Sequence, residues 1–535
     1  MITPPGVDPE AFESALSEWR SIAGEQWVFT DAENLDLYRD AYTPFRNEET
    51  EIIVAAAVAP DTAGQVQAIM RVANRHKIPI YPISTGRNLA YGGSAPVLSG
   101  SVVLDLKRLN RIIEVNERNA YVLLEPGVSY FDLYRHLRDN GSKLWIDCPD
   151  PGWGSLIGNS LDHGAGYTVA PHRDHFDSHC GMEIVLANGE IVRTGMGALP
   201  GAETWQQFKY GFGPTVDGLF AQSNFGVVTK MGFWLFPAPE SFLEAVVTAA
   251  RHDDIIPLVD ITARLTHSGV MNSNILLGSP MRDAALRDPD LRELFLHTDQ
   301  AEVRRKLDDY AGSHKLAFWT SRLKFYGPEK VVKAQWEHAR ERYSGIPGVG
   351  FQEGELLRFP LTEEQIAGMR DQVAIGVPNL SIFSAISRST FNPTPTMGHI
   401  GFSPVIPMTG EAVIESHRVI GQELADMDTT PAFMTMPISY HSRTFIILIA
   451  FSIVEDPAIN RKTREVFRRL IKVAAEHGWG EYRTHTAFMD DCAAVYSYND
   501  HSLRRLHETL KDAIDPNGIL SAGRYGIWPR HLRKK

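Results

Sequence analysis

The fold class is decided by two neighbouring stretches, EIIVAAAVAP at residues 51–60 and IPIYPISTGRNLAYGGSAP at residues 78–96. The first is an apolar run typical of a buried strand, and the second begins as a strand and ends in a glycine-rich loop. Between them, Asp61-Thr62 is a plausible N-cap for an amphipathic helix with apolar positions at helical spacing. These positions include Val66, Ile69, Met70 and Ala73. With a further strand at 101–106, the order indicates an α+β nucleotide-binding module rather than a sandwich or a helical bundle.

The composition is that of a globular enzyme. The chain has 535 residues, which is too long for one core and suggests two to four domains. A net charge of −12 and a pI near 5.9 argue against nucleic acid or an anionic membrane surface as the main partner. The cysteines Cys148, Cys180 and Cys492 are widely spaced without a C-x-x-C, so we expect neither a disulfide framework nor a thiolate zinc site.

Targeting and membrane signals are not apparent. The first twenty residues show no basic and apolar signal-peptide pattern. The longest strongly apolar run, TFIILIAFSIV at 444–454, is too short for a membrane span of about 20 residues and suits a buried strand. We therefore expect a soluble cytoplasmic protein that does not bind a membrane.

Turn and boundary signals divide the rest of the chain. We expect a strand at 121–124, a helix at 129–140 ended by Gly141, a hairpin at 182–192 turning at Asn188-Gly189, and a helix at about 500–514. The Pro-containing FPAPES at 236–241 is a candidate domain boundary. The sequence alone leaves open whether the C-terminal segment packs back onto the first domain.

Two glycine-rich segments are candidates for phosphate contact, STGRNLAYGG at 84–93 and DCPDPGWGSLIGNSLDHGAG at 147–166. Neither is a Rossmann G-x-G-x-x-G or a Walker A motif, because the Lys-Ser/Thr ending and a ribose-binding acid are missing. Glycines beside Ser, Thr and Asn let the backbone approach a pyrophosphate, and successive N–H groups form an anion-binding nest. One such cluster is more often a pair of tight turns, but two at matching strand ends favour a dinucleotide.

Eight motifs follow one another in an order found in a known family. They are STGRNLAYGGSAP, DCPDPGWGSLIGNSLDHGAGYT, RTGMGALPG, YGFGP, QSNFGVVTKMG, GHIGFSP, GWGEYRTHTAFMD and DPNGILSAGRYGIW. The chain closely resembles the vanillyl-alcohol oxidase, eugenol oxidase and 4-cresol dehydrogenase family of FAD enzymes, which act on para-substituted phenols. The resemblance implies an α+β fold: a two-part FAD-binding domain of the PCMH/VAO type, at 1–240 and 482–535, with an inserted α+β substrate cap domain at 241–481.

The resemblance also implies a reaction that begins by ionising a phenol, whose pKa is about 10. Tyr91, Tyr482 and Arg483 match the family's phenolate-binding positions, where two hydroxyls and a guanidinium can offset the charge. The ionised ring makes the benzylic C–H hydridic, hydride passes to flavin N5, and the resulting quinone methide takes up water or loses a proton. Adjacent Tyr-Arg side chains on a strand point to opposite faces, so both can converge only in a loop or bulge. Arg483 is also a candidate to face the flavin N1/O2 edge.

Asp150 matches the family's carboxylate beside flavin N5. Pro151 restricts it to extended geometry, and Trp153 is close enough in sequence to help desolvate it. An acid in an apolar pocket has a raised pKa and can assist with a proton or a water molecule. In isolation, D-P-G is equally typical of an Asx turn. Pro151 departs from the leucine that the family usually carries.

His399, in GHIGFSP, matches the histidine that family oxidases attach to the flavin 8α-methyl group, so we expect covalent FAD through this residue. A histidine without such context is usually a core or surface residue. The other expected FAD contacts come from the glycine loops, one strand and the C-terminal tail. They are Ser84, Thr85, Gly86, Arg87, Asn88, Gly92, Pro149, Gly154, Ser155, Gly158, Asn159, Gly164, Gly166, Tyr167, Gly226, Val227, Val228, Arg483 and Arg524.

Two departures from the family pattern carry structural expectations. Ala90 stands where a glycine is common before Tyr-Gly-Gly, so a positive φ there would be strained. The stretch RTFIILIAFS at 443–452 is apolar where relatives often carry histidines. We therefore expect a hydrophobic substrate cavity that favours alkyl over hydroxylated side chains.

Alternative functions remain open. A cytochrome-linked 4-cresol-type dehydrogenase or hydroxylase is the nearest, although His399 favours an oxidase and the chain has no haem C-x-x-C-H. A metal-dependent hydrolase is more distant: it would use His163, His172, His175, His179 and Cys180, with His175 and His179 spaced i, i+4. No H-E-x-x-H supports it, and we expect no metal. A noncatalytic FAD-binding protein would lack the Tyr-Arg pair.

The function we expect is an FAD-dependent oxidase of 4-alkylphenols, 4-allylphenols such as eugenol, or 4-hydroxybenzylic alcohols such as vanillyl alcohol. O2 would reoxidise the flavin and give H2O2. We expect a homodimer or a higher homo-oligomer.

Overall fold

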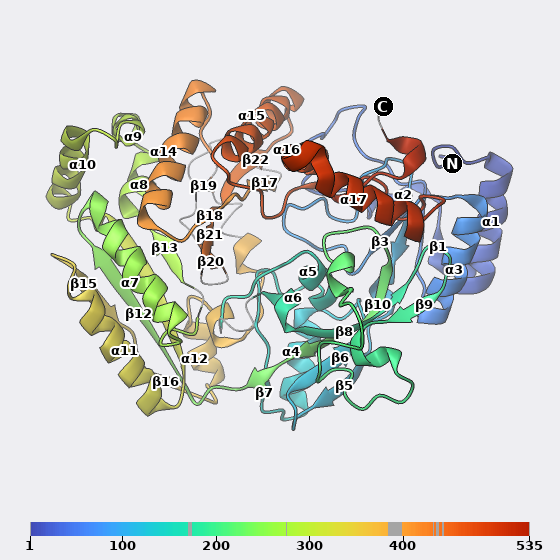
Figure 1. Ribbon diagram of the computed structural model, residues 1–535, viewed down its shortest axis with the longest axis horizontal. Helices are drawn as coiled ribbons and strands as arrows, with labels where there is room; N and C mark the ends of the chain where they lie inside the picture. The colour runs from blue at the N-terminus through green and yellow to red at the C-terminus, as the bar shows by residue number, and fades with distance from the viewer. Residues whose placement is uncertain are drawn as a thin grey trace.

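The structure is a computed structural model that describes residues 2–168, 174–273, 275–383, 398–431, 433–434, 438–440 and 443–533. Figure 1 shows two parts side by side. One is built from the N-terminal elements together with the C-terminal helices, and the other from the elements between them. We call residues 241–481 the cap.

The first glycine loop leaves a small sheet in the order β1-β2-β4-β3. Its strands are β1 (Val28–Phe29), β2 (Ala56–Val58), β3 (Ile80–Ile83) and β4 (Val102–Asp105), and β4 pairs in parallel with both β2 and β3. Helices α1 (Pro9–Ala23) and α3 (Ala63–His76) pack beside it (Figure 1). The Thr62 side chain accepts a hydrogen bond from the Gln65 N–H, which confirms the predicted N-cap. The apolar positions predicted for this helix are buried.

A second sheet has the order β5-β6-β10-β8-β9, and the short helix α5 (Leu156–Leu161) of the other glycine-rich segment packs against its central strand β10. Its strands are β5 (Ile112–Asn116), β6 (Tyr121–Leu124), β8 (His179–Val185), β9 (Ile191–Arg193) and β10 (Val227–Trp234). The predicted hairpin is confirmed, because β8 and β9 pair antiparallel and Gly189 takes a φ of 80°. The predicted helix is α4 (Tyr130–Asp139), which begins with a capping box between Ser129 and Asp132.

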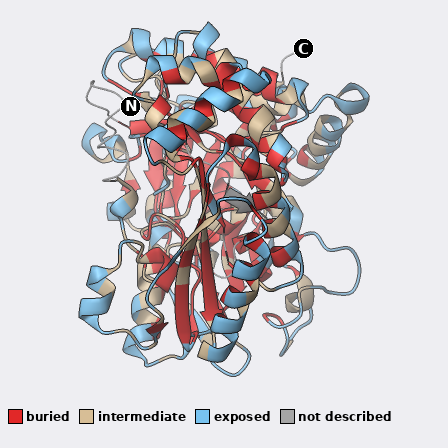
Figure 2. Ribbon diagram, turned by 90° about the vertical axis from the view of Figure 1, so that its left-hand side faces the viewer, coloured by how far each residue is buried: buried red, intermediate tan, exposed pale blue. Residues whose placement is uncertain are grey.

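The cap is built on a sheet in the order β15-β12-β14-β13-β20-β21-β18, with β16 pairing beside β12. Figure 2 shows its long strands buried behind helices with exposed outer faces. The strands are β12 (Ser241–Ala249), β13 (Leu276–Gly278), β14 (Trp319–Gly327), β15 (Gly350–Glu353), β16 (Leu357–Arg358), β18 (Val405–Pro407), β20 (Ile438–Tyr440) and β21 (Thr444–Ile446). The main helices are α7 (Ile255–His267), α8 (Pro280–Ala285), α9 (Pro289–Leu296), α10 (Ala301–Ser313), α11 (Glu329–Tyr343), α14 (Gly410–Asp426) and α15 (Pro457–Glu476).

The apolar run 444–454 was expected to form one strand, and this prediction was wrong in one respect. The run forms β21 in the main cap sheet and then β22 (Ile449–Ile453), which pairs with β17 (Gly398–Phe402) and β19 (Phe433–Met434) in another sheet. The ladder breaks at Ile447, whose N–H donates to the Pro404 carbonyl. One continuous apolar run therefore contributes a strand to each of two sheets. The residue types in the run do not show where the first strand ends and the second begins.

The C-terminal segment returns to the N-terminal part. Helices α16 (Met489–Val495) and α17 (Tyr498–Ile514) lie beside it in Figure 1. Beyond α17 the chain runs along β3, where Ile80 donates to the Ile519 carbonyl at 2.7 Å and accepts from the Ser521 N–H at 2.8 Å. A buried ion pair between Lys511 and Asp515, 2.8 Å apart, holds the segment that makes this turn. The described helices include none that is both long and apolar enough to cross a membrane.

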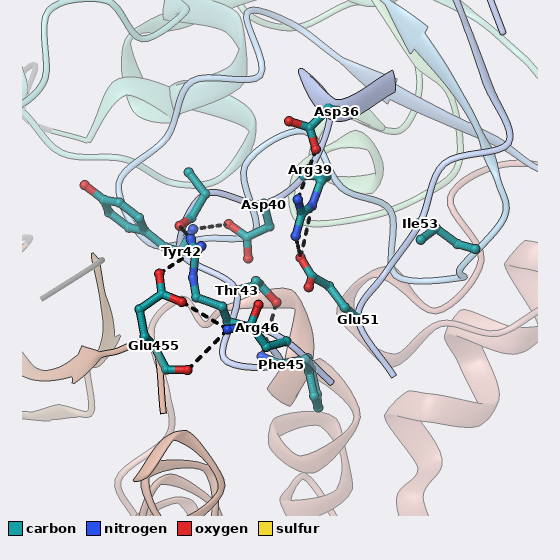
Figure 3. Close-up of polar contacts among 12 residues, drawn as sticks. Asp36, Arg39, Asp40, Tyr42, Thr43, Phe45, Arg46, Glu51, Ile53 and Glu455 are labelled. Carbon is teal, nitrogen blue, oxygen red and sulfur yellow. Dashed lines mark hydrogen bonds and ion pairs between the residues drawn. The ribbon is translucent and has the colours of Figure 1, made fainter. Parts of the chain in front are cut away.

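Residues 36–53 form a connection between the N-terminal part and the cap (Figure 3). The Asn47 side chain donates to Glu455 at 3.0 Å, and Arg46 lies 3.7 Å from the same carboxylate. Arg464 of α15 makes a paired contact with Glu48 at 3.0–3.1 Å. These charged contacts set the position of the cap beside the cavity described next.

Candidate cofactor and active site

A large cavity lies where the two glycine-rich segments, β10 and the C-terminal tail meet, with about 1260 Å³ of unfilled space that is partly open to solvent. Most of the predicted cofactor residues line it. These are Ser84, Gly86, Arg87, Asn88, Pro149, Gly154, Ser155, Gly158, Asn159, Gly226, Val227, Val228, Arg483 and Arg524. Segments far apart in the sequence therefore build one site.

Other predicted cofactor residues are not part of this cavity wall. Thr85 is buried, and Gly92 lies against Thr486. Gly164 and Gly166 lie so close to the side chains of Asn159 and Asp147 that a Cβ would collide with them. These glycines are needed for packing within the loops, and their expected contact with the cofactor stays a prediction. Tyr167 and His399 also lie outside the wall and are described below.

The cavity wall also contains residues that the sequence analysis did not identify. They are contributed by β3, α4, the loop before β10 and the C-terminal turn, and include Tyr81, Tyr130, Asp162, Gln222, Ser223, Asn224 and Ser521. Asn224 and Ser223 lie in QSNFGVVTKMG, so the motif pointed to the segment but not to these side chains. Tyr81 and Tyr130 lie in ordinary apolar patterns with no local signal of function.

The half-buried Arg483 lines the cavity beside two tyrosines. The Arg483 guanidinium lies 4.0 Å from the centroid of the Tyr91 ring and 5.2 Å from that of Tyr482. Burial acts to lower the pKa of Arg483, but the two tyrosines and Asp162 outweigh it and hold the pKa above its usual value. Arg483 is therefore a permanent cation beside two aromatic rings that carry hydroxyl groups.

The two tyrosines differ in how their hydroxyls are used. The hydroxyl of Tyr482 donates to the carbonyl of His163, whereas that of Tyr91 is hydrogen-bonded to Arg483. The Tyr91 oxygen accepts that bond because a guanidinium can only donate, so its own proton remains available. The strand geometry that would separate Tyr482 from Arg483 does not apply, since both follow a single β-bridge at Glu481.

Asp150 lines the same cavity from the second glycine-rich segment. Burial raises its pKa to about 6, with a smaller contribution in the same direction from Asp371 and an opposing one from Lys324. Lys324 of β14 lies 3.0 Å from Asp371. A charge on a cap strand and a charge on a cap loop therefore both shift the pKa of Asp150. Trp153, expected to desolvate Asp150, packs instead against Phe383 at a centroid distance of 4.6 Å and lies under Arg87.

Tyr167 lies close to this group although it does not line the cavity wall. Burial raises its pKa, and Asp150, Tyr482 and Tyr91 add to the rise while Arg483 opposes it. Its carbonyl accepts a hydrogen bond from the Lys324 ammonium at 3.3 Å. Tyr167 therefore links the charged groups of the cap to the Tyr91–Tyr482–Arg483 cluster.

The backbone at Ala90 has the strained conformation expected from the sequence, with a φ of 72°. The following turn is held by the Asn88 side chain, whose oxygen accepts from the N–H groups of Tyr91 and Gly93 at 3.0 and 3.1 Å. This Asx-type turn places Tyr91 over Arg483.

The cavity suits a dinucleotide with polar and ionic groups along its length. The Asn224 side chain is 3% exposed and donates to the carbonyls of Ser521 and Ile527, while its Oδ1 lacks a partner. Arg483 Nε likewise has none within the described residues. A buried amide oxygen and a buried guanidinium nitrogen without partners are costly unless a ligand completes their hydrogen bonds.

Arg524, which belongs to the C-terminal tail, lines the cavity and is held in place by hydrogen bonds to other side chains of the protein. It donates to Asp162 at 2.7 Å and to the Tyr81 hydroxyl at 2.7 Å. Burial alone would raise the pKa of Asp162, but Arg524 and Arg483 lower it below its ordinary value. Arg524 thus orders the wall as well as lining it.

His399 lies on β17 of the cap, facing the N-terminal part. It is 5% exposed, its ring packs against Tyr42 at a centroid distance of 5.3 Å, and burial lowers its pKa to about 4. The imidazole is therefore neutral at physiological pH. Tyr42 belongs to the connecting segment of Figure 3, so His399 is positioned where the two parts of the molecule meet.

The histidines proposed for a metal site are engaged in separate contacts. His175 begins the short helix α6 (His175–Ser178) and contacts Asp147 at 3.2 Å, whereas His179 starts β8 and contacts Asp217 at 3.2 Å. They do not share a helix face, which removes the geometric basis of the hydrolase alternative. His172 lies outside the described residues. Within the ranges that are described, no group of three or more His, Cys, Asp or Glu side chains is arranged to hold a metal ion.

Two family models for FAD enzymes match segments that contribute to the cavity. A family model described as an FAD binding domain matches residues 54–195, and one described as the C-terminal domain of FAD linked oxidases matches residues 424–525. The chain is 32% identical to the 4-cresol dehydrogenase [hydroxylating] flavoprotein subunit of Pseudomonas putida over 98% of both chains. It is 28% identical to the 1'-carboxy-chondrochloren decarboxylase of Chondromyces crocatus, over 98% of this chain and 99% of that protein.

Two solved structures share the whole architecture. The 4-ethylphenol oxidase from Gulosibacter chungangensis, in its isoeugenol complex, has a TM-score of 0.84 at 35% identity and covers 99% of this chain and 100% of its own. A p-cresol methylhydroxylase with substrate bound has a TM-score of 0.83 at 30% identity and covers 99% of both chains. Similarity of this extent, together with a cavity that fits a dinucleotide, shows that the chain is an FAD-dependent oxidoreductase of the vanillyl-alcohol oxidase and p-cresol methylhydroxylase family.

Proposed function

We propose that this protein oxidises para-alkylphenols at the benzylic carbon. The observation that carries the proposal is Arg483, 4.0 Å from the Tyr91 ring and lining the same cavity as Asp150. Its Nε–H is buried and has no acceptor within the described residues. A guanidinium in this position can donate to a phenolate oxygen and stabilise its charge. Relatives named for 4-cresol and 4-ethylphenol support the same substrate class.

The first task of these residues is to ionise the phenol. A phenol in solution has a pKa of about 10, so it is neutral at physiological pH. Arg483 favours the anion by charge, and Tyr91 donates its remaining proton to the phenolate oxygen. Tyr482 is the second hydroxyl of the pair and donates once it turns from the His163 carbonyl. The ionised oxygen then pushes electron density toward the para carbon.

The second task is to move a proton at the para side chain of the substrate. FAD, held by the cavity residues, supplies the two-electron oxidation when bound. Asp150, with a pKa raised to about 6, is ionised at neutral pH yet close enough to that pH to exchange a proton. It can therefore orient and deprotonate the water that adds to a quinone methide, or take a proton when an alkene forms.

We further propose that O2 is the electron acceptor and that His399 carries the flavin covalently. Its neutral, buried imidazole, set between the two parts of the molecule, is in the form that can act as a nucleophile. The alternative acceptor is a cytochrome, because the Pseudomonas putida relative is named a flavoprotein subunit, which implies a partner subunit in that protein. We also retain the expected homodimer, which light scattering can test.

The function is tested with a panel of 4-ethylphenol, 4-cresol, eugenol and vanillyl alcohol on the purified yellow protein. We expect flavin bleaching under argon and H2O2 formation under air. The methyl ether of each phenol is the matched control, and turnover of the ethers at a comparable rate would disprove the phenolate mechanism. Bleaching without H2O2 in air would favour the cytochrome-linked alternative.

Covalent attachment is tested by acid precipitation of the same sample. We expect the yellow colour to stay with the protein and His399→Ala to release it into the supernatant. His417→Ala, another buried histidine of the cap, is the control that should keep the colour bound. Colour retained by the His399 variant would overturn this assignment.

A further inference from the structure

Arg282 lies in helix α8 of the cap, in a cluster separate from the residues that line the cofactor cavity. Its Nε and Nη2 nitrogens are buried and have no hydrogen-bond partner among the residues that the structure describes. The guanidinium lies 4.4 Å from the centroid of the Phe295 ring, on α9. A cation–π contact offsets part of the cost of burying the charge, but it does not satisfy either N–H group.

Two histidines share this region of the cap. His417 of α14 is 1% exposed, and within the described ranges neither ring nitrogen has a hydrogen-bond partner. His252, just before α7, is also 1% exposed, and its Nε2 has no partner within the same ranges. His252 packs against Phe318 at a ring-centroid distance of 5.3 Å, and Phe318 packs at 5.9 Å against Phe295, the ring that the Arg282 guanidinium covers. Helix α14 packs against both α7 and α9, which brings His417 into the same region. In agreement with this packing, burial lowers the pKa of His417, and the charges of Arg282 and His252 lower it further.

No acid balances this cluster in the part of the chain that the structure describes. Asp253 bonds the other ring nitrogen of His252 at 2.6 Å and lies 3.4 Å from Arg304, so its carboxylate is already shared. Burial alone lowers the pKa of Arg282 to about 9, with no carboxylate acting to raise it. An uncompensated buried charge is strongly unfavourable, and buried donors without acceptors add to that cost.

We propose that the cap binds one small inorganic monoanion, such as chloride, between Arg282 and His417. The Nε–H and Nη2–H groups of Arg282 and one ring N–H of His417 donate to the anion. A single negative charge matches the one permanent positive charge of the cluster. The anion joins α8 to α14 and so fixes the outer helices against the cap sheet. Water alone would satisfy the donors but leave the guanidinium charge without a counterion.

The solution test compares the thermal stability of the holoenzyme in sodium chloride and in sodium gluconate at equal ionic strength. We expect chloride to raise the Tm by roughly 1–3 °C in a saturable manner. Arg282→Met should abolish the chloride effect and be at least as stable as the parent protein in gluconate, because the uncompensated charge is gone. Arg305→Met, which removes an exposed charge from the neighbouring α10, should keep the full response.

Arg282→Lys provides a second variant that keeps the charge but loses the forked donor geometry. It should need at least tenfold more chloride for the same rise in Tm. Crystals of the parent protein soaked in bromide should show an anomalous peak within hydrogen-bond distance of Arg282 and His417. An unchanged Tm in chloride, a full response in Arg282→Met, or only water between the two side chains would each overturn the proposal.

Discussion

The Lys324 ammonium lies 3.0 Å from Asp371, and the two have opposite effects on the pKa of Asp150 in the cofactor cavity: Asp371 raises it and Lys324 lowers it. Lys324 comes from strand β14 of the cap, whereas Asp150 comes from the glycine-rich segment 147–166 of the N-terminal part. Lys324 also donates to the carbonyl of Tyr167. The cap therefore does more than cover the cavity: its charges adjust the protonation of an acid on the other side.

This relationship predicts opposite shifts in the pH profile of turnover. With ionised Asp150 as the base of the step that follows hydride transfer, the turnover rate rises with pH through about 6. Asp371→Asn removes a negative neighbour and should move this rise to lower pH, whereas Lys324→Met should move it to higher pH. Steady-state turnover between pH 4.5 and 8.5 measures both shifts. Glu355→Gln, an exposed change in the cap, should leave the profile in place.

Asp150→Asn should separate stability from activity. Because the pKa of Asp150 rises from 3.8 to about 6 on folding, ionising it in the folded state costs about 3 kcal/mol above pH 6. The cost falls as the pH drops from 6 towards 3.8, is already small at pH 4, and vanishes below about pH 3, where the carboxyl is protonated in both states. The variant should therefore be more stable than the parent at pH 7.5 and nearly equal at pH 4, while turnover falls by about 10²–10⁴-fold. Denaturant unfolding at both pH values provides the check, and equal stability at pH 7.5 would contradict it.

Arg483→Met should impair both binding and oxidation of phenols, because it removes the cation beside the phenolate. We expect flavin reduction to slow by about 10²-fold or more. A bound phenol should also lose the absorbance change that reports its ionisation. Arg505→Met, an exposed arginine of α17, is the matched control and should behave as the parent does. A variant at position 483 that still ionises the bound phenol would show that the guanidinium is not the source of the effect.

Lys511→Met should loosen the C-terminal tail from the cofactor cavity. The Lys511 ammonium is fully buried, lies 2.8 Å from Asp515, and donates to the carbonyls of Asn224 and Leu520. Leaving Asp515 unpaired should cost about 3–5 kcal/mol in the free energy of unfolding. Lys333→Met breaks an exposed pair with Glu329 and should cost less than about 1 kcal/mol.

In a His399→Ala background, where the flavin is not held covalently, the same variant should also release FAD more easily, since the Asn224 side chain lines the cavity. Urea unfolding and flavin fluorescence on dilution report the two effects separately. A Lys511 variant as stable as the Lys333 variant would show that the buried pair does not hold the tail.

Local patterns predicted the elements whose formation depends on neighbouring residues. The helix after Thr62, the hairpin at Gly189 and the helix after Ser129 all appear where capping and turn residues placed them. The glycine loops were placed correctly along the cavity, but Gly164 and Gly166 turned out to serve packing within the loops. A sequence shows that a position is glycine, but it does not show which neighbouring atoms occupy the space that a Cβ would fill.

The sequence by itself determined the order of strands, helices and glycine loops, and the motifs that point to an FAD enzyme, because these depend on spacing of a few residues. Only the tertiary structure decided that the apolar run 444–454 would be shared between two sheets and that Lys324 and Asp371 would act on Asp150. The pKa of a buried acid depends on charges brought close by the fold and on exclusion of water, and neither is set by sequence neighbours. The charge environment of the site is thus a property of the assembled domains.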